Sequence, residues 1–517
     1  MSVRLLKNVS SGLIAQAWTG ILGLAVLPVF ARGLGPERYG LLALNLALIN
    51  FAAVADLGVG RAASKYLAED FERKESFRTQ NFISTAMTVT LVTGILGTLL
   101  LAVFAPLLVR HAFRVPAGMQ REAEIAFWIT SAGLLAVLLR ILLDGVLVGH
   151  HRIAALNLGN MAASTLRLGL SVSAILHGES LLTVLGVNVG VAYLHVLGLW
   201  IYTARYFANS VKLTAGWHPD IARQLLKLGI PITASWIIAN IVFLYADRFL
   251  IAAFLPLALT GYYTMAFDIT SRQSYVSNSI AQAFFPVFSG QAAANPGDLE
   301  RSYLQATKAV AVGSTGLAMV LVVFAKPLLA DWIGPEYAAN ATSTLMLLAV
   351  ASLLSCYVSI PSAAIIAGAG QPAVCMKVFS IAVAIHIIAS LVLLRFWGIA
   401  GVAAAFALAL LFVLGSLLVW VSRNLVEVSV ACVLRQCFAG PWISAVTLGA
   451  ICWYLVEPRL HSLLAVAVAF AGAYAVYLGL CTAVAYRSEE REYAFGALST
   501  ALRASWRKSL AIVIGEP

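Results

Sequence analysis

The sequence predicts an all-α protein with many membrane-spanning helices. Apolar residues make up 61% of its 517 residues, and Asp, Glu, Lys and Arg only 11%, whereas soluble proteins average about 45–50% and about 25%. The mean hydropathy is +0.90. The apolar residues also fall into segments of about 20, the length that a helix needs to cross the hydrocarbon core. These observations exclude a soluble enzyme, a secreted disulfide-rich domain and a disordered chain.

Fourteen segments are long and apolar enough to be spanning helices. They cover residues 10–31, 40–60, 82–109, 124–148, 157–176, 181–204, 228–253, 260–288, 305–330, 341–367, 374–394, 398–420, 438–456 and 463–485. A polar stretch at 61–80 is predicted to form a surface helix. The chain then divides into an N-terminal six-helix lobe (1–204), a cytoplasmic linker (205–227), a C-terminal six-helix lobe (228–420), two extra spans (421–486) and a basic cytoplasmic tail (487–517).

A faint internal repeat supports two related halves. GLGPERYG at 33–40 follows the first span, and LPLALTGYY at 255–263 follows the seventh. The two segments align Gly40 with Gly261, at an offset of 221 residues. Repeated halves around a central site are typical of secondary transporters.

Lys and Arg are distributed unevenly between the two sides of the predicted helices. With the N-terminus inside, 22 of them lie on the cytoplasmic side and 8 on the outer side. Because cytoplasmic loops carry the excess of Lys and Arg, both termini are predicted to be cytoplasmic. The net charge of +11 therefore indicates topology and contact with anionic lipids, not binding to nucleic acid.

The motifs of nucleotide hydrolysis and of common hydrolases are missing from the sequence. It contains no Gly-Lys dipeptide, HExxH or GxSxG, and these would mark a P-loop, a zinc protease and a serine hydrolase. The six cysteines lie mostly in apolar segments without metal-ligand spacing. We expect a protein that is not an enzyme, with no catalytic residues, metal or cofactor, and with an H⁺ or Na⁺ gradient to drive it.

Charged residues inside the predicted spans are the candidate functional residues, because each costs about 2.5–3.5 kcal/mol at the centre of a helix. Guanidinium groups bind phosphate oxygens in a bidentate manner, so arginines around a cavity suit a diphosphate-bearing substrate. Aspartates there can bind H⁺ or Na⁺ or hold the arginines in place. The candidates for substrate binding are Arg140, Arg167, Arg248 and Arg272, and those for ion coupling or arginine pairing are Asp56, Asp144, Asp247 and Asp268.

Two of these pairs also have a purely structural interpretation. Arg140 and Asp144 are four residues apart, as are Asp268 and Arg272, so each pair can neutralise itself on one helix face. Both interpretations stay open for these pairs. Arg167 and Arg272 lie deepest in their predicted spans, and Arg167 has no obvious acidic partner in the sequence, so a functional role is favoured for both.

The remaining candidates lie closer to the predicted membrane surfaces. Asp247 and Arg248 are expected to extend to the outer interface. Asp56 is expected to be a structural charge near Arg61 and the cytoplasm. The span at 260–288 is too polar to face lipid, so we expect it to line a cavity, with sugar recognition as an alternative.

The first two spans carry a family resemblance. Their motif residues are Arg32, Leu34, Gly35, Pro36, Glu37, Tyr39, Gly40, Asp56, Gly58, Gly60 and Arg61, and LLKLGIPI at 225–232 adds a second match. With these residues the chain resembles the bacterial polysaccharide-transporter (Wzx-type) flippases, within the superfamily of multidrug extruders and the lipid II flippase. The motif is silent on substrate.

The resemblance implies a fold and an activity. The fold would be two six-helix lobes in a V, plus two C-terminal helices that form a lipid-facing groove or simply pack. The activity would be alternating access that moves an undecaprenyl-pyrophosphate-linked oligosaccharide across the bacterial inner membrane. A polysaccharide polymerase and glycosyltransferases are the implied partners. Related flippases depend on cavity arginines, including one in the eighth helix, where Arg272 lies.

Three other functions are weighed against this one. A multidrug antiporter of the same superfamily would prefer an acidic cavity, and the four arginines argue against it. A non-transporting scaffold of a polysaccharide assembly complex would tolerate neutral residues at those positions. A membrane polymerase or ligase would need a catalytic loop, and the longest outer loop, at 110–123, has no paired carboxylates.

Overall fold

The computed structural model describes residues 3–73, 76–207, 213–236, 243–294 and 296–485, so the predicted basic tail at 487–517 lies outside the described residues. The described residues form helices and no strands. The helices are α1 (Val3–Ala52), α2 (Val59–Arg73), α3 (Ser76–Leu107), α4 (Gln120–Gly149), α5 (Ile153–Leu176), α6 (Leu181–Phe207), α7 (Pro219–Trp236), α8 (Phe243–Phe254), α9 (Leu257–Thr270), α10 (Ser274–Ala294), α11 (Pro296–Val323), α12 (Ala325–Leu328), α13 (Pro335–Ala363), α14 (Pro372–Asn424), α15 (Val430–Val433), α16 (Ala439–Leu455) and α17 (Leu463–Ala485).

The helices account for the predicted spans and confirm an all-α, multi-pass membrane protein. Within the described residues, nine helical segments are long and apolar enough to cross a membrane. Two of them, α1 and α14, bend at Gly35 (φ 72°) and Gly398 (φ 56°), so each covers two predicted spans. Glycine enters this left-handed region without a Cβ clash. The predicted spans at 157–176, 228–253 and 260–288 correspond to α5, to α7 and α8, and to α9 and α10.

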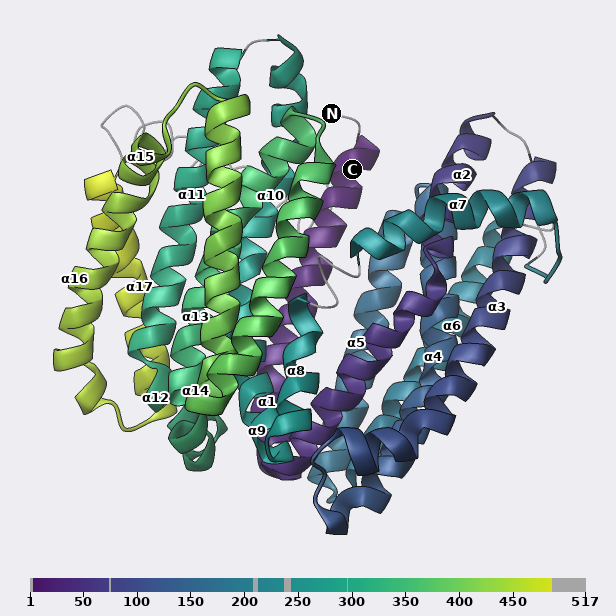
Figure 1. Cartoon of the computed structure of the whole chain (residues 1–517), viewed down its shortest axis with the longest axis horizontal. Helices are drawn as coiled ribbons and strands as arrows, with labels where there is room; N and C mark the ends of the chain where they lie inside the picture. The colour runs from purple at the N-terminus through teal and green to yellow at the C-terminus, as the bar shows by residue number, and fades with distance from the viewer. Residues whose placement is uncertain (1–2, 74–75, 208–212, 237–242, 295, 486–517) are drawn as a thin grey trace, which may run out of the picture.

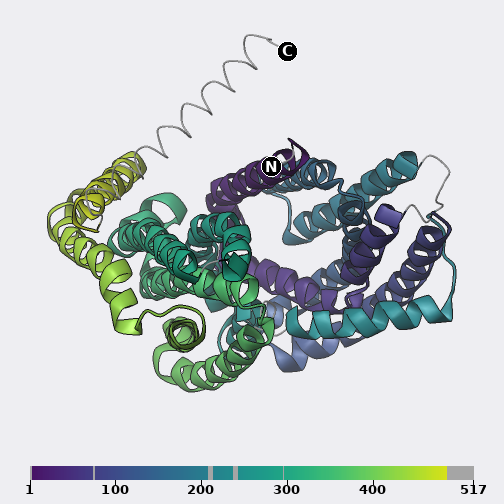
Figure 2. The same cartoon turned by 90° about the horizontal axis from the view of Figure 1, so that it is seen from above.

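Two helical bundles stand side by side and incline towards each other (Figure 1). One contains α2–α6 and the other α8–α14, and α16 and α17 pack on the outside of the second bundle against α11. The view from above shows the same two lobes (Figure 2). The lobes approach each other where α1 bends and α9 begins, which we call the closed end. They diverge towards the opposite end, which we call the open end.

The closed end is built around the internal repeat. A Cβ atom added to Gly40 would lie 2.5 Å from the carbonyl oxygen of Leu257, and one added to Gly261 would lie 2.1 Å from that of Pro36. The offset of 221 residues that aligns Gly40 with Gly261 also aligns Pro36 with Leu257. The two contacts are therefore equivalent, and each half supplies one glycine and one carbonyl oxygen. Two glycines that the sequence aligns therefore pack against each other across a pseudo-twofold axis.

Hydrogen bonds to backbone carbonyl groups near this contact join the two lobes. The Arg32 guanidinium donates to the carbonyl oxygens of Asp331, Trp332 and Ile333, with the Nε to Ile333 bond at 2.9 Å. The amide nitrogen of Arg114 donates to the carbonyl oxygen of Ala252 at 2.7 Å. At the closed end, each lobe thus donates hydrogen bonds to backbone carbonyl oxygens of the other lobe.

Helix α7 does not join the second bundle. It lies across α2 and α3 of the first bundle, where Leu225 is buried with Leu67 and Phe82. Its opposite face exposes Arg223, Gln224 and Lys227, so the helix is amphipathic. Close approach of Gly229 to Gly58 fixes its position, because a Cβ at Gly58 would lie 2.2 Å from the Gly229 carbonyl oxygen. Gly229, assigned from sequence to the C-terminal lobe, therefore contacts the N-terminal one.

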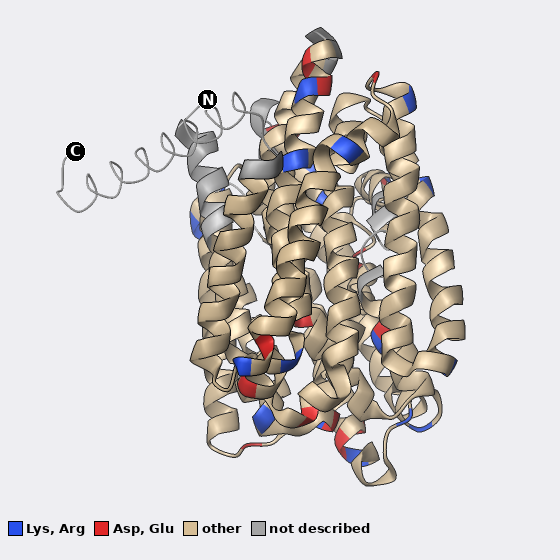
Figure 3. Ribbon diagram, turned by 90° about the vertical axis from the view of Figure 1, so that its left-hand side faces the viewer, with Lys and Arg blue, Asp and Glu red and all other residues tan. Residues whose placement is uncertain are grey.

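The predicted surface helix at 61–80 corresponds in its first part to α2. Ala62, Ala63 and Leu67 are buried, while Arg61 and Lys65 are exposed. Charged residues on the side of the molecule shown in Figure 3 gather towards the two ends of the helices and leave a long middle section almost without charges. This arrangement fits helices that span a bilayer.

Candidate functional site

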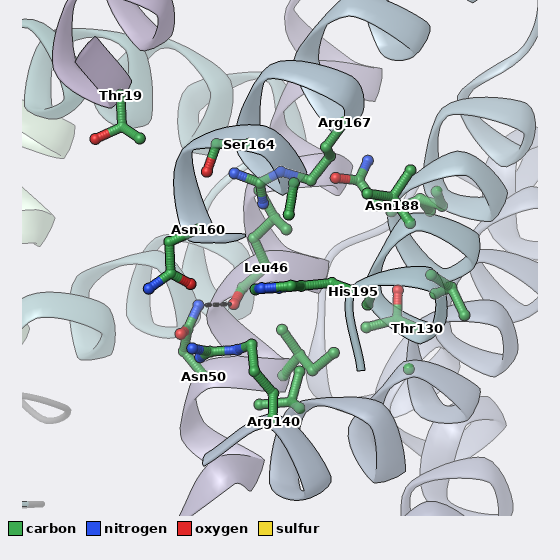
Figure 4. A pocket seen from close by; sticks show the side chains of 18 residues that line it. Thr19, Leu46, Asn50, Thr130, Arg140, Asn160, Ser164, Arg167, Asn188 and His195 are labelled. Carbon is green, nitrogen blue, oxygen red and sulfur yellow. Dashed lines mark hydrogen bonds between the residues drawn. The ribbon is translucent and has the colours of Figure 1, made fainter. Parts of the chain in front are cut away.

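A cavity of about 490 Å³ lies inside the N-terminal lobe between α1, α4, α5 and α6. Arg140 of α4, Arg167 of α5 and His195 of α6 point into it from three sides (Figure 4). Amide and hydroxyl side chains complete its polar lining, namely Thr19, Asn50, Thr130, Asn160, Ser164 and Asn188. The cavity therefore combines two permanent positive charges with neutral hydrogen-bonding groups.

Arg140 is the arginine of this cavity that has a carboxylate partner. Its Nη1 lies 2.6 Å from the Asp144 Oδ2, one turn further along α4. The predicted pairing on one helix face is confirmed. Arg140 also lines the cavity, so the same side chain both pairs with Asp144 and faces the cavity.

Arg167 lies in the cavity without a carboxylate. Among the described residues, no side chain or carbonyl forms a hydrogen bond or ion pair with its guanidinium, and Arg140, which lines the same cavity, carries a charge of the same sign. Five N–H donors are thus available to a ligand. A guanidinium held in a polar cavity beside a second one is an anion-binding arrangement.

Several polar residues of the cavity were not singled out from the sequence. His195, Asn50, Asn160 and Asn188 lie in segments that read as ordinary apolar spans. Asn50 and Asn188 each donate to the carbonyl four residues earlier, at 2.7 Å, which leaves their amide oxygens to face the cavity. Their polarity alone could have identified them, because polar side chains inside membrane spans usually face a cavity or another helix.

Arg272 is separate from the arginine cavity. It lies in the turn between α9 and α10 and faces the first half of α1. Gly23 makes room for it, because a Cβ there would lie 3.1 Å from its Nη2, and Gly20 does the same for Tyr275. The guanidinium hydrogen-bonds to the Tyr275 hydroxyl. The structure thus brings Arg140 and Arg167 together and places Arg272 in the other lobe, across α1.

The expectation that Asp247 and Arg248 reach the outer interface is wrong. Asp247 is 1% exposed and Arg248 5% exposed. Arg248 packs over the rings of Tyr245 and Phe267, and its Nη2 lies 3.8 Å from the Asp268 Oδ1. These residues are held inside the C-terminal lobe because their partners lie on α9 and α14, which the sequence could not place beside α8. Arg248 is therefore remote from the arginine cavity.

Asp268 has partners other than the residue expected from spacing. Its carboxylate faces Arg248 and accepts a hydrogen bond from the Tyr39 hydroxyl at 2.9 Å, while Arg272 turns to Tyr275. The helix breaks after Thr270, so the regular i, i+4 register between Asp268 and Arg272 is lost.

Asp56 lies at the junction of the first two helices, away from the arginine cavity. It is buried where the chain turns from α1 into α2, and its carboxylate accepts from the backbone amide of Gly60 at 3.3 Å. A carboxylate at the start of a helix satisfies free backbone amides and complements the helix dipole.

An apolar groove of about 420 Å³ lies between α11, α13 and α16. Val350, Trp442, Val446, Trp453 and Tyr454 are among its exposed lining residues. It lies on the outer side of the C-terminal lobe, where the two extra C-terminal helices attach. Such a surface suits contact with lipid chains.

Comparisons with known proteins agree with this architecture. The model of the "Polysaccharide biosynthesis protein" family matches residues 5–291. The "Putative O-antigen transporter" of Shigella flexneri is 21% identical over 366 residues, which cover 70% of this chain and 84% of that protein.

Two solved structures show the same fold. The lipid II flippase MurJ in an inward closed conformation matches with a TM-score of 0.74 and 14% identity over 91% of this chain and 98% of MurJ. An inward-facing multidrug MATE transporter matches with a TM-score of 0.65 and 17% identity, over 84% and 96% of the two chains. Two related lobes, a multi-pass helical fold and a family match over more than half of the sequence give one conclusion: the chain belongs to the polysaccharide biosynthesis protein family, with the fold shared by MurJ and MATE transporters.

Proposed function

We propose that this protein is a flippase that moves an undecaprenyl-diphosphate-linked oligosaccharide across the bacterial inner membrane by alternating access. The cavity in the N-terminal lobe carries this proposal, because it presents Arg167 without a counter-charge beside Arg140. A diphosphate would supply the missing negative charge. In this role the protein translocates its substrate without a chemical step.

Other parts of the molecule support the same proposal. Amide and hydroxyl groups around the arginines suit a glycan close to the diphosphate. The apolar groove beside α16 suits the polyprenyl chain, which must stay in an apolar environment while the head group moves. The Shigella flexneri relative is named as an O-antigen transporter, which fits a glycan cargo. Glycosyltransferase partners would supply that cargo, and a polysaccharide polymerase would consume it.

The orientation is part of the proposal. With both termini in the cytoplasm, the closed end faces outwards and the open end faces the cytoplasm, where the lipid-linked substrate would enter. The present conformation would then be inward-facing, and an H⁺ or Na⁺ gradient would drive the cycle.

The first test measures binding of undecaprenyl diphosphate, with undecaprenol as the control lipid, by native mass spectrometry of the purified protein. Hydrogen bonds to charged groups contribute about 1.5–3 kcal/mol, so Arg167→Gln should weaken binding of the diphosphate about 10- to 150-fold. Arg167→Lys keeps the charge but loses the bidentate geometry, and we expect an intermediate loss. The matched control is Arg395→Gln, which removes an exposed arginine of α14 outside the cavity.

The second test measures flipping of fluorescent undecaprenyl-diphosphate oligosaccharides in proteoliposomes. Transport that Arg167→Gln abolishes and Arg395→Gln leaves intact would support the flippase. Equal binding of the diphosphate lipid and of undecaprenol would refute the role of the arginine cavity. Export of cationic dyes without binding of the diphosphate lipid would instead support a multidrug antiporter.

A further inference from the structure

A second cluster of buried ionisable side chains lies in the C-terminal lobe, apart from the arginine cavity. It consists of Asp247 of α8, Tyr263 of α9 and His386 of α14. Tyr263 and His386 are fully buried, and Asp247 is 1% exposed. Ionisable groups inside a membrane protein are costly, so a buried carboxylate–imidazole pair is a candidate for proton transfer.

Both carboxylate oxygens of Asp247 are occupied by protein donors. Oδ1 lies 2.6 Å from the His386 Nε2, and Oδ2 accepts from the Tyr263 hydroxyl. The Phe406 ring packs against the imidazole, with the two ring centroids 5.4 Å apart. Hard cations need several oxygen ligands, and in the part of the chain that the structure describes no group of three or more His, Cys, Asp or Glu could hold a metal. This site therefore suits a proton better than Na⁺.

The charges around the cluster balance when the pair of His386 and Asp247 holds one extra proton, as in an imidazolium beside a carboxylate. Arg248 of α8 and Asp268 of α9 face it as a second, oppositely charged pair, 3.8 Å apart. The other titratable groups nearby are tyrosines, namely Tyr39 of α1, Tyr245 of α8 and Tyr337 of α13. Two aspartates and Arg248 sum to one negative charge, which an imidazolium cancels. A net charge is expensive in a low-dielectric interior, so the protonated cluster fits this buried state.

The cluster is connected to the closed end of the molecule. Tyr263 lies two residues after Gly261, and Tyr39, which donates to Asp268, immediately precedes Gly40. The two glycines form the reciprocal contact between the lobes. When the lobes separate there, both tyrosines must move with their helices, and the Tyr39 bond across the two lobes must break.

We propose that His386, paired with Asp247, is the proton-binding site of this transporter, and that proton binding stabilises the closed-end contact seen in this conformation. This inference rests on the proposed function in that it names the coupling ion. One proton enters from water when the closed end opens, binds to the imidazole ring, and leaves on the other side of the membrane after the lobes have changed conformation. No other bond is made or broken in this step.

The test measures the conformational equilibrium without any substrate. Spin labels are attached at Lys65→Cys on α2 and Arg301→Cys near the start of α11, both of which are exposed at the open end. Cys432, the one described cysteine that is not buried, is replaced by serine. Double electron–electron resonance then gives the distance between the lobes at pH 5.5, 7.0 and 8.5, with either Na⁺ or K⁺.

We expect a longer distance between the labels at low pH, where the closed end is stabilised and the open end is wide. One coupled proton changes the ratio of the two conformations by up to about tenfold per pH unit. His386→Gln keeps a donor for Asp247 but cannot be protonated, so it should give the high-pH distances at every pH. Asp247→Asn removes the negative charge and should give the low-pH distances at every pH.

Control variants separate this cluster from other histidines. His177→Gln changes an exposed residue at the end of α5 and should keep the wild-type response. A response that persists in His386→Gln, one that disappears in His195→Gln instead, or one that follows Na⁺ rather than pH would overturn the proposal. If His386→Gln does not fold, Asp247→Asn and Tyr263→Phe must still reduce the pH response. Because no lipid is present, the result is independent of the glycan and of the arginine cavity.

Discussion

The reciprocal contact between Gly40 and Gly261 predicts that single methyl groups can shift this protein between conformations. Alanine at Gly261 would place its Cβ 2.1 Å from the Pro36 carbonyl oxygen, and alanine at Gly40 would place its Cβ 2.5 Å from that of Leu257. The neighbouring atoms in both cases belong to backbone, which cannot rotate away as a side chain can. The two helices must therefore separate by about 1 Å to reach an ordinary contact distance.

The expected magnitude follows from the cost of overpacking. An added methyl group in a tight interface costs about 1–3 kcal/mol, and this cost applies to the conformation in which the closed end is closed. The population of that conformation should fall about 5- to 150-fold relative to its alternative. Gly190→Ala is the matched control, because a Cβ on this glycine of α6 would meet no atom within 4 Å.

The distance between spin labels on α2 and α11 measures this shift. Gly40→Ala and Gly261→Ala should both shorten the distance at the open end, and Gly190→Ala should leave it unchanged. Unchanged distance distributions in both variants would refute the view that this glycine contact determines the balance between conformations.

Two further predictions concern packing inside the C-terminal lobe. Asp268→Asn removes the carboxylate that faces the buried Arg248. Breaking a fully buried ion pair costs about 3–5 kcal/mol, and the cost here is smaller because the Asp268 side chain is 30% exposed. The double variant Arg248→Met/Asp268→Asn should melt at a higher temperature in detergent than Asp268→Asn alone, and a lower melting temperature would contradict this account. Gly316→Ala would place a Cβ 2.3 Å from the Tyr477 ring, so it should lower the melting temperature by overpacking α11 against α17. Gly472→Ala, which meets no atom within 4 Å, is its control.

The helical segments could be predicted from the sequence because each depends on local composition. An apolar run of about 20 residues can satisfy its backbone in lipid only as a helix. The predicted spans accordingly fall on helices, and the pairing of Arg140 with Asp144 followed from helical spacing alone. The repeat that aligns Gly40 with Gly261 could also be recognised in the sequence. The sequence did not show that these two glycines contact each other.

The sequence was insufficient where a residue's partner lies on a distant helix. Asp247 is buried with His386, 139 residues away, and Asp268 bonds to Tyr39, 229 residues away. No local sequence pattern indicates which residues pair over such long separations along the chain. The same reason applies to α7. Its amphipathic sequence predicts that one face packs against other helices, but it does not show that these helices belong to the first lobe.

The sequence by itself determined that this is a multi-pass helical membrane protein with two related halves and arginines inside its spans, because helix formation in lipid and the cost of a buried charge are properties of each segment alone. Only the tertiary structure decided that Arg140 and Arg167 share one cavity, that Arg248 belongs to a separate buried cluster, and that Asp247 faces His386. Those relations depend on how helices far apart in the chain pack together, and packing is a property of the whole molecule.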